Sequence, residues 1–214
     1  MNSRKSLYKV KEIYYTLQGE GARTGRPAVF LRFTGCNLWS GREEDRSDAV
    51  CKFCDTDFYG MNGTLGGKYD AAALASQVNE LWPKDNGRKY VVCTGGEPLL
   101  QLDEELIKAL HGFDFEIAIE TNGTITVPQG IDWICVSPKA NTDVVVREGN
   151  ELKLVVRQQN INPADFENWA FKNYYLQPMD GPYLQEFTQW ATQYCLEHPQ
   201  WRLSIQTHKL LGIR

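Results

Sequence analysis

Three of the chain's six cysteines, Cys36, Cys51 and Cys54, lie within nineteen consecutive positions. Fourteen residues separate the first two, and two residues separate the second pair. A structural zinc site would need a fourth ligand from a distant cysteine or from one of the three histidines. Three thiolates can instead hold an iron–sulfur cluster and leave one iron open to a ligand that is not protein. An open iron favours catalysis over electron storage, and zinc binding stays an alternative.

Two other functions of the CKFC pair fit the sequence less well. A zinc deaminase needs a His-x-Glu motif upstream of its Cys-x-x-Cys pair, and no histidine of this chain is followed by that pattern. A thioredoxin-like pair would leave Cys36 without a purpose. The other cysteines, Cys93, Cys135 and Cys195, lie in apolar strand or helix patterns, so we expect them to be buried structural thiols.

A glycine loop follows the apolar run KYVVC, with the sequence TGGEP from Thr94 to Pro98. Its two glycines let the backbone approach a ligand closely, and Glu97 offers an anion to a cation such as an ammonium group. The loop lacks the Gly-Lys-Ser/Thr ending of a nucleotide-binding P-loop, so phosphate is not its evident ligand. An ordinary strand-to-helix turn can have the same composition, which makes this motif weak by itself.

The elements that must position these residues are predicted from apolar runs and their periods. Turn signals bound seven runs of strand length, at residues 28–33, 89–94, 116–121, 132–137, 151–156, 174–178 and 201–206. Between several of them lie helical patterns that share an apolar face, made by Leu74, Val78, Leu81 and Trp82, by Leu102, Leu106 and Leu110, and by Leu184, Phe187, Trp190 and Tyr194. This alternation predicts an α/β fold with a largely parallel sheet, open or partly closed into a barrel.

Several of these predicted strands have one polar face. Arg202, Ser204, Gln206 and His208 alternate with apolar or small residues, so we expect one strand to carry all four. Arg32 interrupts another apolar run, where an arginine is costly unless it is paired. We expect the polar faces to line a wet concavity, with solvated edge strands as the alternative, and Arg32 to be a site residue.

The overall composition narrows the classes of protein. A chain of 214 residues with 42% hydrophobic residues is expected to form one domain, over residues 1–214. No apolar run is long enough to span a membrane, and the first twelve residues contain no stretch of signal-peptide length. We therefore expect a cytoplasmic protein whose thiols stay reduced. The net charge of −4 gives no reason to expect nucleic acid binding, which favours a small-molecule substrate.

A series of short motifs resembles one enzyme family in content and order. The motifs are YTLQGEG, GRPAVFLRFTGCNLWSGREEDR, CKFCDTDF, CTGGEP, IETNG, ICVSPK, LQPMDGP and WRLSIQTHK, and they cover nearly the whole chain. On these residues the chain resembles the radical S-adenosylmethionine (SAM) enzymes and, among them, the 7-carboxy-7-deazaguanine synthase family of queuosine and deazapurine biosynthesis. The resemblance implies a partial, modified (β/α) barrel of the radical SAM type. The gap of fourteen residues departs from the superfamily's usual three, but it occurs in a subgroup of this family.

The resemblance also implies a set of cofactor-binding residues. Cys36, Cys51 and Cys54 would bind a 4Fe-4S cluster, whose fourth iron would take the amino nitrogen and a carboxylate oxygen of SAM. The further SAM contacts would be Phe53, Asp55, Gly96, Glu97, Glu120, Asn122, Ser137, Pro138, Lys139, Gln177, Pro178, Met179 and Asp180. For Pro178 and Met179, packing at a strand end is a competing explanation.

By the same resemblance, the substrate would be 6-carboxytetrahydropterin. Its contacts would be Leu17, Gln18, Gly19, Glu20, Arg32, Thr94, His208 and Arg214, with Thr94 and His208 on neighbouring strands. Gln18 and Glu20 can read the donors and acceptors of the heterocycle, and Arg32 can fork onto its carboxylate. Thr56 would supply a hydroxyl ligand to a Mg²⁺ ion that also binds the substrate, unless it only caps a turn. The last residues would close the pocket, with the side chain of Arg214 directed outward.

The implied reaction makes the chain a lyase. It abstracts hydrogen from C6 of the substrate, contracts the ring and releases ammonia to give 7-carboxy-7-deazaguanine, with no catalytic residue beyond the cluster and cofactor. The resemblance further implies an external one-electron donor and a homodimer. An activating enzyme of the same superfamily, which acts on a glycine of a protein partner, is the alternative enzyme and predicts an open cleft. A zinc-binding module is the alternative without an activity.

Overall fold

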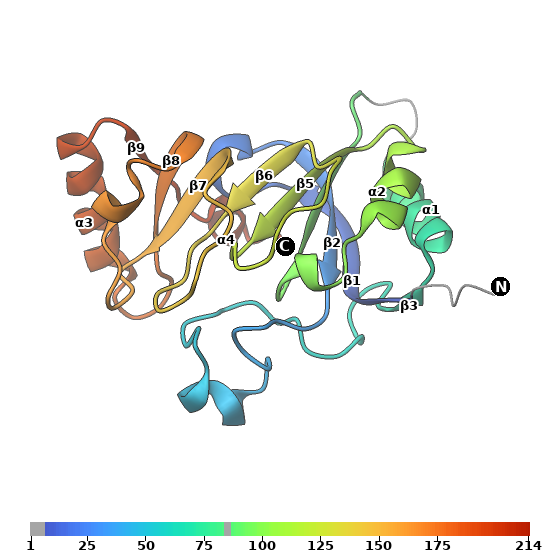
Figure 1. The fold of residues 1–214 in the computed structure, drawn as a ribbon, viewed down its shortest axis with the longest axis horizontal. Helices are drawn as coiled ribbons and strands as arrows, with labels where there is room; N and C mark the ends of the chain where they lie inside the picture. Colours follow the sequence, from blue (N-terminus) through green and yellow to red (C-terminus); the bar gives the residue numbers. More distant parts are fainter. Residues whose placement is uncertain (1–6, 84–86) are drawn as a thin grey trace.

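The computed structural model describes residues 7–83 and 87–214. The expectation that the first twelve residues hold no targeting segment therefore falls partly outside the described residues. Nine strands of the described chain form one sheet in the order β3-β1-β2-β4-β5-β6-β7-β8-β9 (Figure 1). Their bounds are Tyr8–Leu17 (β1), Pro27–Phe33 (β2), Gly67–Tyr69 (β3), Tyr90–Gly95 (β4), Glu116–Thr121 (β5), Trp133–Val136 (β6), Glu148–Val156 (β7), Ala170–Pro178 (β8) and Trp201–Leu203 (β9).

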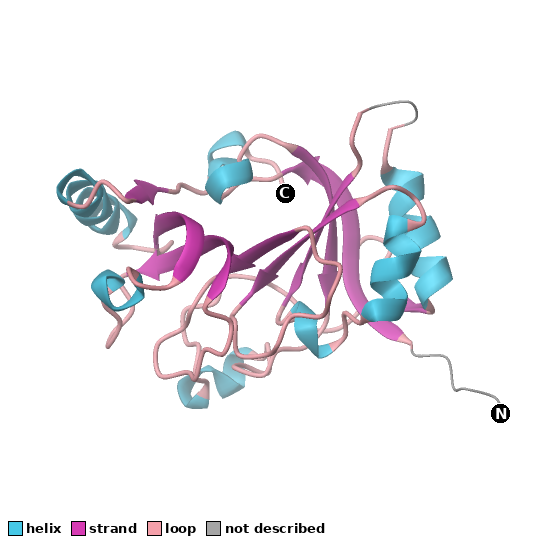
Figure 2. Cartoon of the chain, turned by 45° about the horizontal axis from the view of Figure 1, so that its top comes forward, coloured by secondary structure: helices cyan, strands magenta, loops and turns pink. Residues whose placement is uncertain are grey.

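The sheet is parallel from β2 to β9, while β1 pairs antiparallel with both β2 and β3. It curves strongly without closing (Figure 2). The predicted α/β fold with a largely parallel, partly closed sheet is confirmed. β1 and β3 are missing from the predicted strands. In β1 the pairing register shifts between Val10 and Glu12, which breaks the alternation that a sequence pattern needs.

Helices cover the sheet at its two ends. Helices α1 (Ala71–Leu81) and α2 (Glu104–His111) pack against each other beside the first strands, and α3 (Leu184–Glu197) packs on β8 and β9 (Figure 1). A short helix, α4 (Thr207–Leu211), ends the chain. The 3-10 segments are Gly21–Arg23 (η1), Glu43–Asp48 (η2), Pro98–Leu100 (η3) and Pro163–Phe166 (η4). The three predicted helical patterns are thus confirmed.

The helix starts follow from local chemistry. Asp70 accepts a hydrogen bond from the backbone N–H of Ala73 and caps α1, and Asp103 does the same for α2 through Leu106. The predicted apolar faces of both helices are buried, whereas α3 buries only Ala191 fully. This agrees with the looser apolar pattern of the third helix.

The last predicted strand is too long. β9 ends at Leu203, and α4 begins at Thr207, so His208 lies on a helix and not on a strand beside Thr94. The backbone N–H of Ser204 makes the last bond to β8, and that of Thr207 already bonds to Gly19 at the end of β1. The alternating pattern was therefore misleading, because the chain leaves the sheet to cross toward β1.

Two apolar clusters form the core. The larger packs α1 and α2 on β1, β2, β4 and β5, and the smaller packs α3 on β7 and β8. Cys93 and Cys135 are buried, as predicted, and Cys195 is half-buried at the edge of the smaller cluster. Over the described ranges, none of the helices combines the length and the apolar character needed to cross a membrane.

Candidate active site

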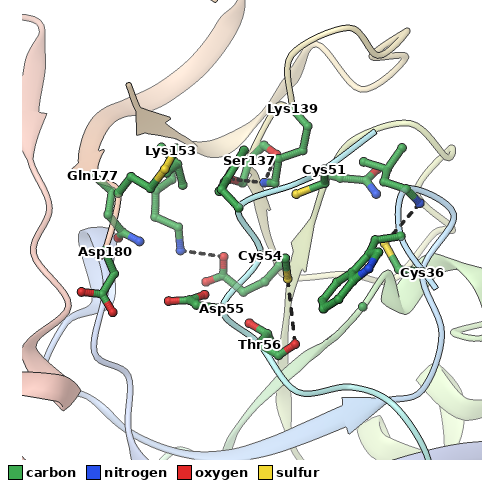
Figure 3. A pocket seen from close by; sticks show the side chains of 18 of the residues that line it. Cys36, Cys51, Cys54, Asp55, Thr56, Ser137, Lys139, Lys153, Gln177 and Asp180 are labelled. Atoms are coloured by element: carbon green, nitrogen blue, oxygen red, sulfur yellow. Dashed lines mark hydrogen bonds and ion pairs between the residues drawn. The ribbon is translucent and has the colours of Figure 1, made fainter. Parts of the chain in front are cut away.

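The three clustered cysteines line one pocket at the carboxyl ends of the parallel strands. Cys36 follows β2, and the fourteen residues after it form a loop that contains η2. The carbonyl of Leu38 accepts hydrogen bonds from the backbone N–H groups of Val50 and Cys51, which closes this loop and returns the chain to Cys36. Figure 3 shows the three cysteines on one side of the pocket. We call this cavity, of about 180 Å³, the cysteine pocket.

Side chains of the long loop fix its shape. The guanidinium of Arg46 lies 4.0 Å from the ring centre of Trp39 and donates hydrogen bonds to the carbonyls of Lys52 and Cys54. Trp39 packs edge-on against Phe58 with ring centres 5.4 Å apart. These contacts hold the backbone from Lys52 to Cys54, so the loop is ordered by its own residues.

The thiols are free and suited to a cluster. All six cysteines of the chain are unpaired by disulfides, and burial raises the pKa values of Cys36 and Cys51. In the described ranges, no three His, Cys, Asp or Glu side chains could hold a single metal ion. A zinc site needs its ligands around one ion, whereas the thiolates of a 4Fe-4S cluster bind separate irons and stand further apart. Three free thiols that line one pocket are the ligands that a 4Fe-4S cluster with one open iron requires.

The glycine loop packs directly on the first cysteine. The backbone N–H of Glu97 donates to the carbonyl of Gly35, and a Cβ atom at Gly96 would lie 2.7 Å from that of Cys36. Only glycine fits there. The carboxylate of Glu97 is fully buried and accepts hydrogen bonds from Thr121 Oγ1 and from the backbone N–H of Asn122, each at 2.8 Å. Burial raises its pKa in spite of these bonds.

Most of the predicted SAM contacts lie around the cysteine pocket. They come from the loop after Cys51 and from the carboxyl ends of β4, β5, β6 and β8: Phe53, Asp55, Gly96, Glu120, Asn122, Ser137, Lys139, Gln177, Pro178, Met179 and Asp180. Glu97 and Pro138 do not line it, because both are buried behind its wall. Ligands of open α/β sheets bind at this end of the strands. Lys139 Nζ donates to the carbonyl and to the hydroxyl of Ser137, at 2.7 and 2.8 Å (Figure 3).

A second cavity, of about 280 Å³, contains Arg32 and is called the arginine pocket. All the predicted substrate contacts line it: Leu17, Gln18, Gly19, Glu20, Arg32, Thr94, His208 and Arg214. The guanidinium of Arg32 is paired, as predicted for a partly buried arginine. Its Nε lies 3.0 Å from Glu12 Oε1, and its Nη2 lies 2.9 Å from the hydroxyl of Tyr14.

The β1–β2 connection shapes the floor of the arginine pocket. The backbone N–H of Gly21 donates to Ser204 Oγ at 3.0 Å, and that of Ala22 donates to Glu151 Oε2 at 3.1 Å, which ties the connection to β7 and to the chain after β9. Gly21 has φ +66°, and a Cβ atom there would overlap the Glu151 carboxylate. This turn fixes the preceding Gln18, whose Nε2 lies 3.1 Å from Glu120 Oε1.

The end of the chain forms the opposite wall. Gln206 Nε2 donates to Glu20 Oε1 at 2.9 Å, and the backbone N–H of Thr207 donates to the carbonyl of Gly19. The carbonyl of Arg214 accepts a hydrogen bond from Thr16 Oγ1 at 2.8 Å, while its side chain is 60% exposed. The C-terminal residues and the segment that follows β1 therefore build the arginine pocket together.

The two pockets meet. Glu20, Asp55, Thr56, Glu120 and Gln206 line both of them, so a molecule in one would contact a molecule in the other. Lys209 Nζ lies 2.5 Å from Asp55 Oδ2 and 2.6 Å from Asp180 Oδ2 beside this junction. A cofactor at the cysteines and an anionic substrate at the arginine could thus react directly.

Comparisons with known proteins agree with this geometry. Residues 46–150 match the model of the radical SAM superfamily. A 7-carboxy-7-deazaguanine synthase of Bradyrhizobium diazoefficiens is 62% identical over 97% of this chain and 99% of its own length. One from Burkholderia multivorans is 60% identical over 96% of this chain and 99% of its own. The chain belongs to the 7-carboxy-7-deazaguanine synthase family of radical SAM enzymes.

A solved structure supports the same assignment. The crystal structure of QueE from Escherichia coli matches with a TM-score of 0.70 at 26% identity, over 94% of each chain. Membership of the radical SAM superfamily implies a 4Fe-4S cluster and SAM as cofactors. The alternative of a zinc-binding module without an activity is therefore wrong. In this member of the 7-carboxy-7-deazaguanine synthase family, the cysteine pocket offers three free thiols beside the glycine loop.

Sequence reasoning missed Lys153 and Lys209. Lys153 lies on β7 and lines the cysteine pocket, and Lys209 lies on α4 and lines the arginine pocket. A signal for the first was present, because Glu151 and Lys153 alternate with Leu152 and Leu154 in the buried part of β7. Two charges on one face of a buried strand indicate a polar cavity on that side. No comparable signal marked Lys209, which lies in the tail beyond the last predicted strand.

Proposed function

We propose that this chain is a carbon–nitrogen lyase that converts 6-carboxy-5,6,7,8-tetrahydropterin into 7-carboxy-7-deazaguanine with loss of ammonia. The product is the one in the names of the relatives. The observation that carries the proposal is the junction of the two pockets. The three thiols line one pocket, Arg32 lines the other, and the carboxylates of Glu20 and Glu120 line both. The reaction would serve queuosine or deazapurine biosynthesis.

In this proposal, the cysteine pocket holds the cofactors. Cys36, Cys51 and Cys54 ligate the cluster, and the other lining residues of the pocket surround SAM. When bound, the cluster and SAM supply the one-electron chemistry that removes a hydrogen atom from C6 of the substrate, with the electron coming from an external donor. Gly96 lets the backbone of the glycine loop approach the methionine end of SAM. Glu97, buried against β5, would support that loop through its hydrogen bond from the backbone N–H of Asn122.

The arginine pocket holds the substrate. Arg32 is already oriented by Glu12 and Tyr14, and its remaining N–H groups are suited to a carboxylate. Gln18 and Glu20 present an amide and a carboxylate to the heterocycle. The C-terminal residues cover the pocket and exclude water from the reacting carbon. The protein's part is therefore to position C6 beside the cofactor, which requires little acid–base chemistry of its own.

A Mg²⁺ ion bound by Thr56 is the finer part of the proposal. Thr56 lines both pockets, where its hydroxyl could reach an ion that also contacts the substrate. Thr56→Val keeps the shape and removes the oxygen, so we expect it to abolish the stimulation of turnover by Mg²⁺ while cluster content and SAM cleavage persist. Turnover is measured against Mg²⁺ concentration, with Thr192→Val, an exposed position on α3 outside both pockets, as the control. A stimulation of Thr56→Val equal to that of the parent contradicts this site.

The proposal extends to the state of the protein in the cell. Residues 1–214 would form one domain, because a single sheet connects both core clusters. Six free cysteines suit a reducing compartment, which favours the cytoplasm. The family resemblance supports a homodimer.

Turnover tests the function. The anaerobically reconstituted protein is given SAM, Mg²⁺, dithionite as the electron donor and 6-carboxytetrahydropterin, and the products are followed by mass spectrometry. We expect 7-carboxy-7-deazaguanine to accumulate in excess over the enzyme. Cleavage of SAM without this product would instead favour the activating enzyme that acts on a protein glycine.

A further inference from the structure

Lys153 connects the two pockets through a buried pair of ion contacts. Its side chain is only 5% exposed, and its Nζ atom lies 2.8 Å from Glu20 Oε2 and 2.8 Å from Glu120 Oε2. The three residues come from separate parts of the chain, namely β7, the turn after β1, and β5. Figure 3 shows Lys153 across the cysteine pocket from Cys36, on the side of Gln177 and Asp180.

Both carboxylates that Lys153 contacts line both pockets. Their second oxygens are held as well, since Glu20 Oε1 accepts from Gln206 and Glu120 Oε1 accepts from Gln18. The ammonium is thus the centre of a chain of polar contacts that runs across the junction. A ligand that shifts one carboxylate must act on the other through the same ammonium.

The charges give this contact a chemical consequence. Burial alone would raise the pKa of Glu20, but the Lys153 ammonium and the hydrogen bonds from Lys153 and Gln206 lower it to about 2. Glu20 is therefore an ionised carboxylate that can only accept hydrogen bonds. Glu151, two residues before Lys153 on β7, is different, because burial raises its pKa to about 7. The Lys153 ammonium thus keeps Glu20 ionised, although the carboxylates of Glu120 and Glu151 lie nearby.

We propose that Lys153 is a positioning residue that holds the Glu20 and Glu120 carboxylates at the junction and thereby couples substrate binding to SAM binding. This inference rests on the proposed function. A carboxylate held in this way accepts two hydrogen bonds from adjacent N–H donors, such as the 2-amino and ring N–H groups of a 2-amino-4-oxopyrimidine edge. Lys153 would then also contribute to the preference for that edge over one that lacks the 2-amino group.

The test compares Lys153→Met, which keeps the length and removes the charge, with Lys153→Arg, which keeps the charge. Lys89→Met, whose parent side chain bonds Asn79 away from both pockets, is the control. Iron content and circular dichroism report cluster loading and folding. The binding of 6-carboxytetrahydropterin is measured by calorimetry with and without SAM, in the absence of a reductant.

We expect each ligand to increase the affinity of the parent protein for the other by about fivefold or more. In Lys153→Met this factor should fall to about one, and substrate affinity should fall by about tenfold or more, because a buried charge contact is removed. Lys89→Met should behave as the parent. Unchanged coupling in a folded, cluster-loaded Lys153→Met overturns the inference. Lys153→Arg, which keeps the charge, should retain part of the coupling. If Lys153→Met fails to load its cluster, Lys153→Gln decides in its place, with a coupling factor near one expected and parental coupling contradictory.

A pH profile separates positioning from general support of the fold. The titratable groups around Glu20 and Lys153 are Glu151 of β7, Glu120 of β5, Cys135 of β6, Lys139 after β6 and His208 of α4. Without the ammonium, burial raises the pKa of Glu20, so substrate affinity of Lys153→Met should rise with pH as this carboxyl loses its proton. The parent should lack this rise, and Glu20→Gln combined with Lys153→Met should lose it. A profile equal to that of the parent contradicts the inference.

The outcomes also distinguish this inference from the proposed function. A parent protein that binds and converts 6-carboxytetrahydropterin, together with a Lys153→Met variant that keeps full coupling, overturns the inference alone. A parent protein that neither binds nor converts the pterin overturns both.

Discussion

The cysteine pocket and the arginine pocket are built in different ways. The cysteine pocket uses a motif loop and the carboxyl ends of β4, β5, β6 and β8, which a parallel sheet brings to one edge. The arginine pocket is closed by two segments that lie far apart in the sequence, with residues 17–20 on one wall and residues 206–214 on the other. The first is therefore fixed by the regular sheet, whereas the second depends on a tail that folds back after the sheet has ended.

This difference suggests a division of labour. Radical chemistry in a superfamily needs the same cofactor geometry each time, and a regular sheet edge supplies it. Substrates vary, and the residues that read them lie on connections and on the terminus, where changes disturb the fold least. Substitutions of the three cysteines should therefore abolish all chemistry, and those of residues that line the arginine pocket alone should affect the substrate alone.

The largest effect is expected from the cysteines. Cys36→Ala, Cys51→Ala and Cys54→Ala should each lose cluster binding and all detectable activity, because two thiolates do not hold the cluster in place. Iron content and SAM cleavage after anaerobic reconstitution measure this. The matched controls, Cys93→Ala and Cys195→Ala, should keep their cluster and lose only stability, by roughly 1–2 kcal/mol. If one of the first three variants is active, the cysteine that it lacks is not a ligand of the cluster.

An intermediate effect is expected at Arg32. Arg32→Gln should weaken substrate binding by about tenfold or more, since it leaves the substrate carboxylate without its buried charged partner. Iron content and the cleavage of SAM in the absence of substrate should be unchanged. Lys108→Gln, which removes an exposed ion pair on α2, is the control. If Arg32→Gln impairs SAM cleavage as strongly as substrate binding, the two pockets are not separable.

The smallest effect is expected from the tail. Deletion of residues 211–214 removes the hydrogen bond from Thr16 to the carbonyl of Arg214 and opens one wall of the arginine pocket. Substrate affinity should fall by about threefold to tenfold, in line with the loss of one or two hydrogen bonds, and SAM affinity should stay the same. Unchanged substrate affinity would show that the tail has no part in closure.

The predictability of the two pockets differs for physical reasons. The cysteine spacing, the glycine loop and the strand–helix alternation are local signals, and they led to a fold that is confirmed. The SAM contacts were implied by the family resemblance, and most of them line the cysteine pocket. Glu97 could not be separated from the pocket-lining residues, because only the close approach of β5 shows that its carboxylate turns toward Asn122.

The arginine pocket was less accessible to sequence reasoning. Arg32 stood out because its strand is otherwise apolar. Arg214 was suggested by family resemblance alone. His208 was suggested by the resemblance and by the alternating polar pattern, which wrongly placed it on a strand. The long-range bond between Thr207 and Gly19, which ends the sheet there, leaves no trace in the local pattern. Lys153 and its partners are similarly far apart in sequence and meet only in the folded chain.

The metal content of the protein tests the central claim most directly. Purified under anaerobic conditions and reconstituted with iron and sulfide, the chain should be brown and contain roughly four irons and four sulfides, and SAM should alter the spectrum of the reduced cluster, because one iron is open to it. A colourless protein that retains zinc and takes up no iron would contradict the account.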